Sequence, residues 1–339
     1  MLNLTLVITI LVVVLALIFD FINGFHDTAN SIATSVSTRV LSPGAAITMA
    51  AVLNFFGAFI SVKVAKTVGS DIVSPDSIPQ TVIIAALLGA ISWNLITWYF
   101  GLPSSSSHAL IGGLLGAAIA FSGSFAIVNW INFLDKILLW LFLSPCIGFL
   151  AGFLFMNLLN RFLRSWRPAT VTKVFSKAQI VSAALMALNH GGNDAQKSMG
   201  IITMALLSGG LIPQFDVPLW VKVFCALAMA AGTSVGGWKI IKTMGINMAR
   251  LAPVNGFAAE TGAAAVIFTA TMLHSPVSTT HIISTSIMGV GAAKRMSSVR
   301  WILAKDIVWA WVLTIPITAF LSGIIFHLID FVLLKLILV

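Results

Sequence analysis

Charged side chains are scarce in this sequence. Only 9% of its 339 residues are Asp, Glu, Lys or Arg, whereas 59% are apolar and the mean hydropathy is +1.04. Water-soluble domains carry roughly 25% charged and about 45–50% apolar residues, so the composition excludes a soluble globular protein. Cysteine is also rare. Cys146 and Cys225 both lie in apolar stretches, which excludes a disulfide framework and a cysteine-rich metal site.

Long apolar stretches occupy most of the chain. Backbone polar groups in lipid must be satisfied within their own segment, so such stretches form helices. Each spanning helix needs about 20 residues, so the sequence predicts an all-α polytopic membrane protein with roughly ten to twelve membrane segments. Some stretches are too short to span alone, which predicts broken or re-entrant helical hairpins. The net charge of +9 is expected in basic cytoplasmic loops, and not on a nucleic-acid-binding surface.

Three motifs recur in the second half of the chain, in the same order and each about 170 residues further on. The pairs are Asn23–Asp27 with His190–Asp194, Lys63–Gly69 with Lys239–Gly245, and Pro103–His108 with Pro276–His281. Three separate motifs at nearly one spacing predict an internal duplication. The predicted organisation is a first repeat over 1–160, a basic linker over 161–177 and a second repeat over 178–339.

Loop charges predict how the two repeats are oriented. The linker 161–177 contains five basic residues and no acidic one, which places it in the cytoplasm. Lys294, Arg295 and Arg300 mark a basic loop in the second half, whereas the matching stretch 121–132 is uncharged. This difference predicts inverted repeats in the cell (plasma) membrane, with both termini outside. Inverted repeats are typical of secondary transporters.

A polar cluster follows the first apolar stretch, where lipid should exclude charge. An ionised Asp at the centre of a membrane helix costs ~2.5–3.5 kcal/mol. Asn23, Asp27 and Asn30 nevertheless lie at spacings that share one helical face, and Asn193 and Asp194 repeat the pattern. Carboxylate and amide oxygens are ligands for a hard cation such as Na⁺, and a carboxylate can carry a proton. These five residues form the predicted coupling-cation site.

Two simpler interpretations of this cluster stay open. It could be a polar cap at a helix end, or Asp194 and Lys197 could merely neutralise one another. Its duplication in two repeats favours a functional site. Gly24, Gly191 and Gly192 are expected to let each helix open here, because glycine stabilises a helix poorly.

The repeated Pro–hydroxyl–His motifs predict two helices that begin inside the membrane. Pro fits the first turn of a helix, Ser or Thr caps its start, and its free N–H groups carry a partial positive charge. Two such ends facing each other would form a cage for a tetrahedral oxyanion. Hydroxyls that only bond to carbonyls of a kinked helix are the alternative. The candidate anion ligands are Ser105, Ser106, Ser107, Ser278, Thr279 and Thr280.

The lack of basic residues near these motifs predicts symport. No charged side chain occurs over 77–134, and Glu260 is alone over 251–293. A divalent anion would be poorly compensated by hydroxyls and helix dipoles in a medium of low dielectric. Bound cations at Asp27 and Asp194 would supply the missing charge, and such coupling is reciprocal.

Four further residues are candidates for a proton or ion relay. They are Lys197, Glu260, His108 and His281. Glu260 could instead be a charge at a helix N-terminus, and the two histidines could only orient the helix caps. Tryptophans such as Trp311 are interpreted as interfacial anchors. No enzyme is expected, because adjacent pairs such as Ser107 and His108 point about 100° apart on a helix.

These motifs resemble the inorganic phosphate transporter (PiT) family, over essentially the whole chain. The resemblance is carried by 23–30, 93–108, 190–197 and 276–281. It implies phosphate at the two hydroxyl-rich hairpin tips, a coupling cation at Asp27 and Asp194, and a role for Glu260 in transport. The implied function is import of inorganic phosphate by symport with a proton or sodium ion. The coupling H⁺ or Na⁺ takes the place of a cofactor, and no resident metal or catalytic residue is expected.

Several alternatives stay open within transport. Asn54 and Lys197 differ from the animal relatives and resemble the proton-coupled bacterial carriers, some of which move a neutral metal–phosphate complex. The family also includes sulfate permeases, and a divalent-metal transporter would use His26, Asp27, His190 and Asp194. The expected partners are inorganic phosphate, the co-transported cation and membrane lipid, with no nucleic acid. Assembly as a homo-oligomer is left open.

Overall fold

Helices form nearly all of the chain. The computed structural model describes residues 4–273 and 275–337, and this part contains no β-strand, only the isolated bridges Val73–Val128 and Ala249–Val299. The first half contains α1 (Leu4–Ser37), α2 (Pro43–Gly57), α3 (Lys63–Lys66), α4 (Gln80–Phe100), α5 (Ser106–Ser122), α6 (Trp130–Phe133) and α7 (Leu139–Phe162). The second half contains α8 (Pro168–Ser208), α9 (Leu219–Val235), α10 (Trp238–Lys242), α11 (Pro253–Met272), α12 (Thr279–Lys294) and α13 (Trp301–Ile337).

Short helices of other kinds connect these elements. The π-helices are η1 (Thr67–Asp71), η4 (Leu134–Leu138) and η5 (Thr243–Asn247), and the 3₁₀ turns are η2 (Pro75–Ser77), η3 (Phe125–Ile127) and η6 (Met296–Ser298). Both Lys-x-x-Lys-Thr motifs enter a π-helix, after α3 and after α10. The order of elements is therefore repeated as well as the sequence motifs.

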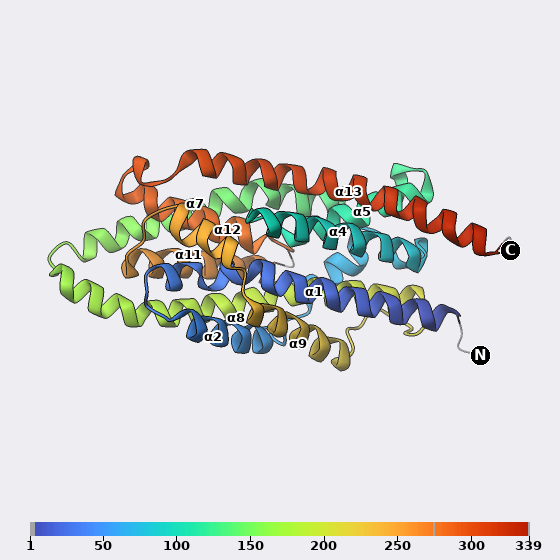
Figure 1. Ribbon diagram of the computed structural model, residues 1–339, viewed down its shortest axis with the longest axis horizontal. Helices are drawn as coiled ribbons and strands as arrows, with labels where there is room; N and C mark the ends of the chain where they lie inside the picture. The colour runs from blue at the N-terminus through green and yellow to red at the C-terminus, as the bar shows by residue number, and fades with distance from the viewer. Residues whose placement is uncertain (1–3, 274, 338–339) are drawn as a thin grey trace.

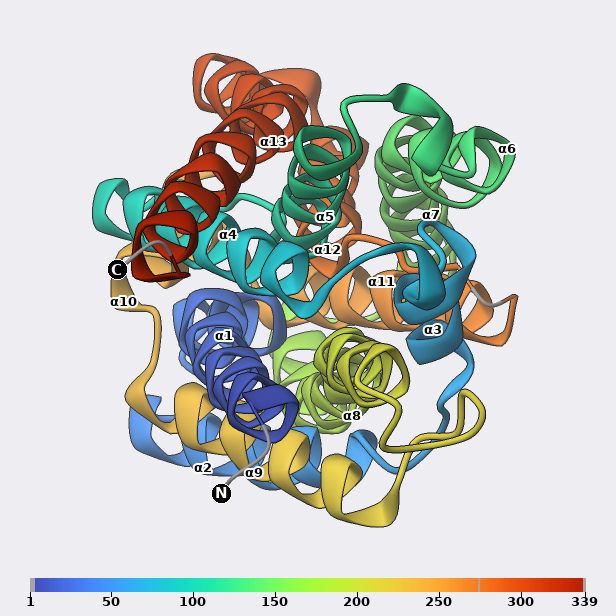
Figure 2. The same ribbon diagram turned by 90° about the vertical axis from the view of Figure 1, so that its right-hand side faces the viewer.

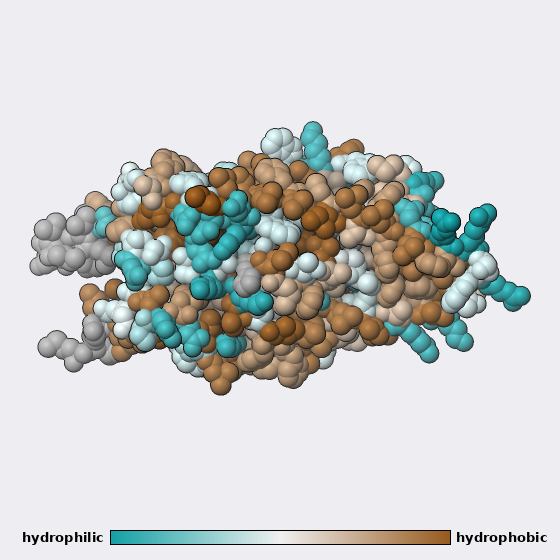
Figure 3. Space-filling view, turned by 180° about the vertical axis from the view of Figure 1, so that it is seen from behind, coloured by the Kyte–Doolittle hydropathy of each residue, from teal (hydrophilic) through white to brown (hydrophobic). Residues whose placement is uncertain are grey.

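Several apolar helices are long enough to cross a membrane, whereas α2 and α5 are shorter, and the sequence predicted segments of both kinds. Five described segments pass by length and composition, namely Leu4–Ser37, Gln80–Phe100, Trp130–Phe162, Pro168–Ser208 and Trp301–Val332, and a bent pair around α9 and α10 would make a sixth. Ten of the described helices contain 15 or more residues. On the face seen in Figure 3, apolar side chains cover a broad region between hydrophilic ones at the right-hand end and a second hydrophilic group left of centre. The chain is thus an all-α, multi-pass membrane protein.

Helices of the two halves interlock. α5 packs against α13 and α12 against α7, while α2 packs against α8 and α9 against α1, as the end-on view shows (Figure 2). Residues 1–160 and 178–339 are therefore not separate bodies. Within the predicted basic linker, 161–177, the helices α7 and α8 continue to Phe162 and from Pro168.

Two hydrophobic cores follow one another along the axis of the bundle. α1 contributes Val12 and Phe19 to the first core and then Ile32 to the second. α8 meets the cores in the reverse order, because Met186 lies in the second core and Met199 in the first. α1 and α8 thus run in opposite directions, as Figure 1 also shows. The polar clusters of both helices fall between the two cores, in the middle of the bundle.

Glycines bring the helices of this polar layer into contact. α1 and α8 run without a break through Gly24 and Gly191, so the expected opening of each helix is wrong. A Cβ on Gly24 would lie 2.4 Å from the carbonyl oxygen of Met229, and one on Gly191 would lie 2.3 Å from that of Asn54. The missing side chains therefore let α9 and α2 approach the backbone directly.

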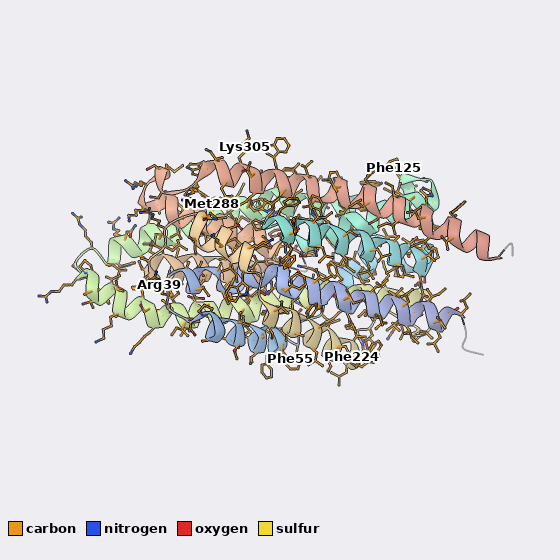
Figure 4. All side chains as sticks on the ribbon, viewed as in Figure 1. Arg39, Phe55, Phe125, Phe224, Met288 and Lys305 are labelled. Carbon is orange, nitrogen blue, oxygen red and sulfur yellow. The ribbon has the colours of Figure 1, made fainter. Side chains whose placement is uncertain are left out.

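The two ends of the molecule differ. Both termini lie at one end, whereas the α7–α8 connection lies at the other (Figure 1). Long side chains with nitrogen tips project from that second end, while Phe55 and Phe224 point outward from the side of the bundle (Figure 4).

Candidate functional site

The two hydroxyl-rich motifs form the tips of two helical hairpins. α4 packs against α5, and α11 against α12, with a non-helical break between the helices of each pair. Ser105 is the N-cap of α5, and its Oγ accepts a hydrogen bond from the His108 backbone N–H at 3.2 Å. Ser278 caps α12 in the same way, with the His281 backbone N–H at 3.2 Å. Proline, hydroxyl cap and histidine thus build the same helix start twice.

The two tips meet. The rings of His108 and His281 lie edge to face with their centroids 4.9 Å apart. Trp311 of α13 stacks on His281 at 4.0 Å and donates a hydrogen bond to the Pro103 carbonyl at 2.8 Å. Trp311 is only 3% exposed, so its interpretation as an interfacial anchor is wrong. It binds the two tips together, a contact that no local pattern indicates.

The second tip is joined directly to α1 and α8. The Asn30 side-chain amide donates hydrogen bonds to the hydroxyls of Thr279, at 3.3 Å, and Thr280, at 2.9 Å. The Thr279 hydroxyl in turn donates to the Asp194 carboxylate at 3.1 Å. Residues predicted for the anion and residues predicted for the cation are therefore in contact.

Asp194 is the centre of this network. Lys197 Nζ contacts one carboxylate oxygen, and His190 Nε2 lies 3.2 Å from the other. Ligand atoms of Asp27, His190 and Asp194 all lie within 4.8 Å of one another, and all three residues are buried. The structure thus brings the two predicted cation clusters, from α1 and α8, to one place.

A hydrogen-bonded chain connects Asp27 to the first tip. His26 Nδ1 lies 2.7 Å from Asp27 Oδ1, and His26 Nε2 lies 3.0 Å from the Thr97 hydroxyl. The Ser104 hydroxyl donates to the same Thr97 oxygen at 2.8 Å. Thr97 and Ser104 were not predicted as site residues. Their signal is weak, because a hydroxyl near a helix break usually only caps it.

Several buried oxygens of this layer have no hydrogen-bond partner among the described residues. They are the side-chain carbonyl oxygens of Asn23, Asn30 and Asn193. The Asp20 carboxylate is buried in the same layer, beside Ser198 and Cys225. A buried unsatisfied acceptor costs about 1–3 kcal/mol, so a cluster of them favours the binding of a ligand that donates or carries positive charge. Oxygens of this kind suit a hard cation.

Other unpartnered polar atoms gather at the tips, where a hydroxyl can donate and a neutral imidazole offers one donor and one acceptor. The Ser106 hydroxyl, His108 Nδ1 and both ring nitrogens of His281 are buried without a partner in the described chain. Ser105 and Ser278 already cap their helices, so their oxygens are occupied as acceptors. Free donors at two adjacent helix starts suit an oxyanion.

Glu260 occupies a second polar cluster. The Thr34 and Ser182 hydroxyls donate to its two carboxylate oxygens, and the Gln179 side-chain amide donates at 3.2 Å. Glu260 lies beyond the first turn of α11 and is fully buried, so it is not a charge at a helix N-terminus. Its three donors come from α1 and α8, so this carboxylate connects three helices, α1, α8 and α11, by hydrogen bonds.

The match to known proteins decides the family. Residues 23–322 match the phosphate transporter family. The chain belongs to the phosphate transporter family. It is 52% identical over 297 residues, 87% of this chain and 89% of the relative, to the "Probable low-affinity inorganic phosphate transporter" of Bacillus subtilis. The corresponding protein of Rhizobium meliloti is 49% identical over 87% of this chain and 88% of the relative.

A solved structure has the same fold. "The sodium-dependent phosphate transporter" superposes with a TM-score of 0.85 and 25% sequence identity, over 96% of this chain and 99% of that chain. This chain is therefore a phosphate transporter, and not an enzyme. The roles of the individual site residues in this phosphate transporter stay predictions.

Proposed function

We propose that this phosphate transporter imports inorganic phosphate across the cell membrane by symport with a cation, a proton or Na⁺. Phosphate would bind between the tips, at the free donors of Ser106, Thr280 and the two helix starts. The observation that carries the proposal is the hydrogen bond from Thr279, in the second tip, to Asp194, in the cation cluster.

The charges of the site support cation coupling. Asp27 and Asp194 supply two carboxylates, and the one ammonium group nearby, that of Lys197, already contacts Asp194. Phosphate would add negative charge at a place of low dielectric without a free basic side chain. A buried, uncompensated charge is costly, so phosphate should bind well only when a proton or cation occupies the carboxylate and amide oxygens.

The direction of α1 and α8 supports inverted repeats. The two helices start the two halves of the chain and run in opposite directions through the same two cores. Basic side chains project from the end where α7 passes into α8, and the positive-inside rule assigns that end to the cytoplasm. Both termini would then lie outside.

One observation favours transport of phosphate as a complex with a divalent cation. Asp27, His190 and Asp194 hold their ligand atoms within 4.8 Å, which suits a divalent cation bound together with phosphate as a neutral complex. Lys197 opposes this arrangement, because its ammonium occupies one oxygen of Asp194. Phosphate uptake that requires Mg²⁺ or another divalent cation would support the complex.

Uptake in proteoliposomes tests the proposal. The purified protein would be reconstituted, and labelled phosphate uptake measured with a pH gradient and a sodium gradient imposed separately, with and without divalent cations. Stimulation by one gradient identifies the coupling ion. Uptake that responds to neither gradient nor divalent cations would refute symport, and sulfate that competes as well as phosphate would favour a sulfate permease.

A further inference from the structure

One arrangement of the backbone occurs twice at the surface, at opposite ends of the bundle (Figure 1). It consists of a π-helix, an isolated β-bridge and a tryptophan side chain hydrogen-bonded to a carbonyl, and is called the cradle below. In the first half, η1 is followed by the bridge Val73–Val128, and Trp130 Nε1 donates to the Phe125 carbonyl at 2.8 Å. In the second half, η5 is followed by the bridge Ala249–Val299, and Trp301 Nε1 donates to a carbonyl at 2.8 Å in the same way. Each cradle lies over a pocket, of about 310 Å³ and about 460 Å³ respectively.

The two pockets carry opposite chemistry. The first is lined by apolar residues, two serine hydroxyls, the Asn129 amide and the Asp71 carboxylate, which pairs with Lys136 at 2.7 Å. The second is lined by four cations and two serines, with no acidic residue among its lining. None of the four forms an ion pair with a described residue. The cations are Arg250, Lys294, Arg295 and Arg300.

Loop basicity alone does not explain this pocket. Scattered lysines and arginines satisfy the positive-inside rule, whereas here four of them converge on one hollow formed by two chain segments. The Ser298 hydroxyl accepts a hydrogen bond from Arg295 Nε at 3.3 Å, and the Arg300 backbone N–H donates to the Met248 carbonyl at 3.1 Å. The arginines are therefore held on an ordered backbone. Arginine forks suit a phosphate group.

An apolar groove continues from the basic pocket. Arg300 lines both, and the groove extends over Val299, Trp301, Ile302 and Leu303, with Asp306 also in its lining and a volume of about 460 Å³. Ile302 is 84% exposed, although it lies at the start of a membrane span, Trp301–Val332. A cationic hollow beside an apolar groove, at the start of a membrane span, matches an amphiphile better than a free anion.

We propose that the pocket between η5 and the α12–α13 connection binds the headgroup of an anionic phospholipid. The phosphate group would lie among the four cations, and the first part of an acyl chain would lie along Trp301 and Ile302. Free inorganic phosphate has the same headgroup chemistry but would leave the groove uncovered. The site is separate from the transport site, because its residues belong to the surface end of the bundle.

Lipid binding to the full-length protein tests this proposal. The purified, delipidated protein would be titrated with dioleoyl-phosphatidylglycerol and dioleoyl-phosphatidylcholine and followed by native mass spectrometry. We expect one tight site for the anionic lipid, weakened about fivefold for each cation removed, hence about 25-fold in Arg250→Gln with Arg300→Gln. Ile302→Ser, which keeps every charge, should also weaken binding by severalfold.

A matched pair of charges provides the control. Arg161→Gln with Arg164→Gln removes the same charge from exposed residues at the same end of the molecule, and should leave the tight site intact. Equal binding by wild type and by the Arg250 and Arg300 double variant would overturn the proposal. Competition by inorganic phosphate or by glycerol phosphate as strong as by the whole lipid would overturn the assignment to lipid. Phosphate uptake by both double variants in neutral vesicles checks that they fold.

Discussion

Replacing Thr279 with valine should weaken the coupling between phosphate binding and cation binding. Valine keeps the shape of threonine but lacks the hydroxyl that donates to Asp194 at 3.1 Å and accepts from Asn30 at 3.3 Å. In the wild type, this hydroxyl is the direct contact between the second tip and the carboxylate of α8. Its loss removes the contact while leaving both helices in place.

The expected size of the effect follows from the charged partner. A hydrogen bond to a charged group contributes about 1.5–3 kcal/mol, and a change of 1.4 kcal/mol is tenfold in an equilibrium constant. The variant should therefore bind phosphate roughly 10- to 150-fold more weakly at saturating cation. The cation should lose the same factor, because coupling between two ligands is reciprocal.

The assay is phosphate uptake in proteoliposomes as a function of both ligands. The KM for phosphate is measured at several concentrations of the coupling cation, in the wild type and in Thr279→Val. We expect a wild-type KM that falls as the cation rises, and a variant KM that is higher and changes less. Thr318→Val is the matched control, since this buried hydroxyl donates only to carbonyls of its own helix, at 2.7 and 3.1 Å. A variant KM with the wild-type value and wild-type cation dependence would refute the proposed contact.

Three further changes address the rest of the site. Asp194→Asn should abolish coupled uptake and lower the melting temperature, because Lys197 is left buried without its partner. Asp194→Asn with Lys197→Met should recover the melting temperature but not uptake. Recovered uptake in this double variant would contradict the cation site. Glu260→Gln should destabilise the protein by about 1–3 kcal/mol, because two hydroxyl donors lose a carboxylate acceptor. An unchanged melting temperature in detergent would show that the Glu260 carboxylate does not stabilise the contact between α1, α8 and α11. Gly191→Ala should destabilise by about 1–3 kcal/mol through overpacking, whereas Gly44→Ala, which has open space around its Cβ, should not; equal melting temperatures would contradict the close approach of α2.

The helices and their breaks could be predicted from the sequence. Apolar stretches form helices in lipid because each backbone group must find a partner within its own segment. The hydroxyl caps of α5 and α12 are equally local, since Ser105 and Ser278 bond to an N–H three residues further on. Such features depend on a few neighbouring residues, and for that reason a motif of six residues was enough to predict them.

The contacts between distant segments could not be predicted in this way. Glycine in the polar helices indicated opening, but the neighbours of Gly24 and Gly191 come from α9 and α2, and their backbones fill the space. Tryptophan indicated an interface, but Trp311 is buried against His281. In both cases the local preference of the residue type is outweighed by packing against a helix far away in the chain.

By itself, the sequence determined that this is an all-helical membrane protein with repeated motifs, capped helix starts and buried carboxylates, because these properties follow from composition, spacing and local hydrogen bonds. Only the tertiary structure decided that α1 and α8 bring Asp27 and Asp194 together and that the two tips face one another. Those arrangements depend on how helices of the two halves cross, and crossing is set by side-chain packing over long sequence separations, which no single segment specifies.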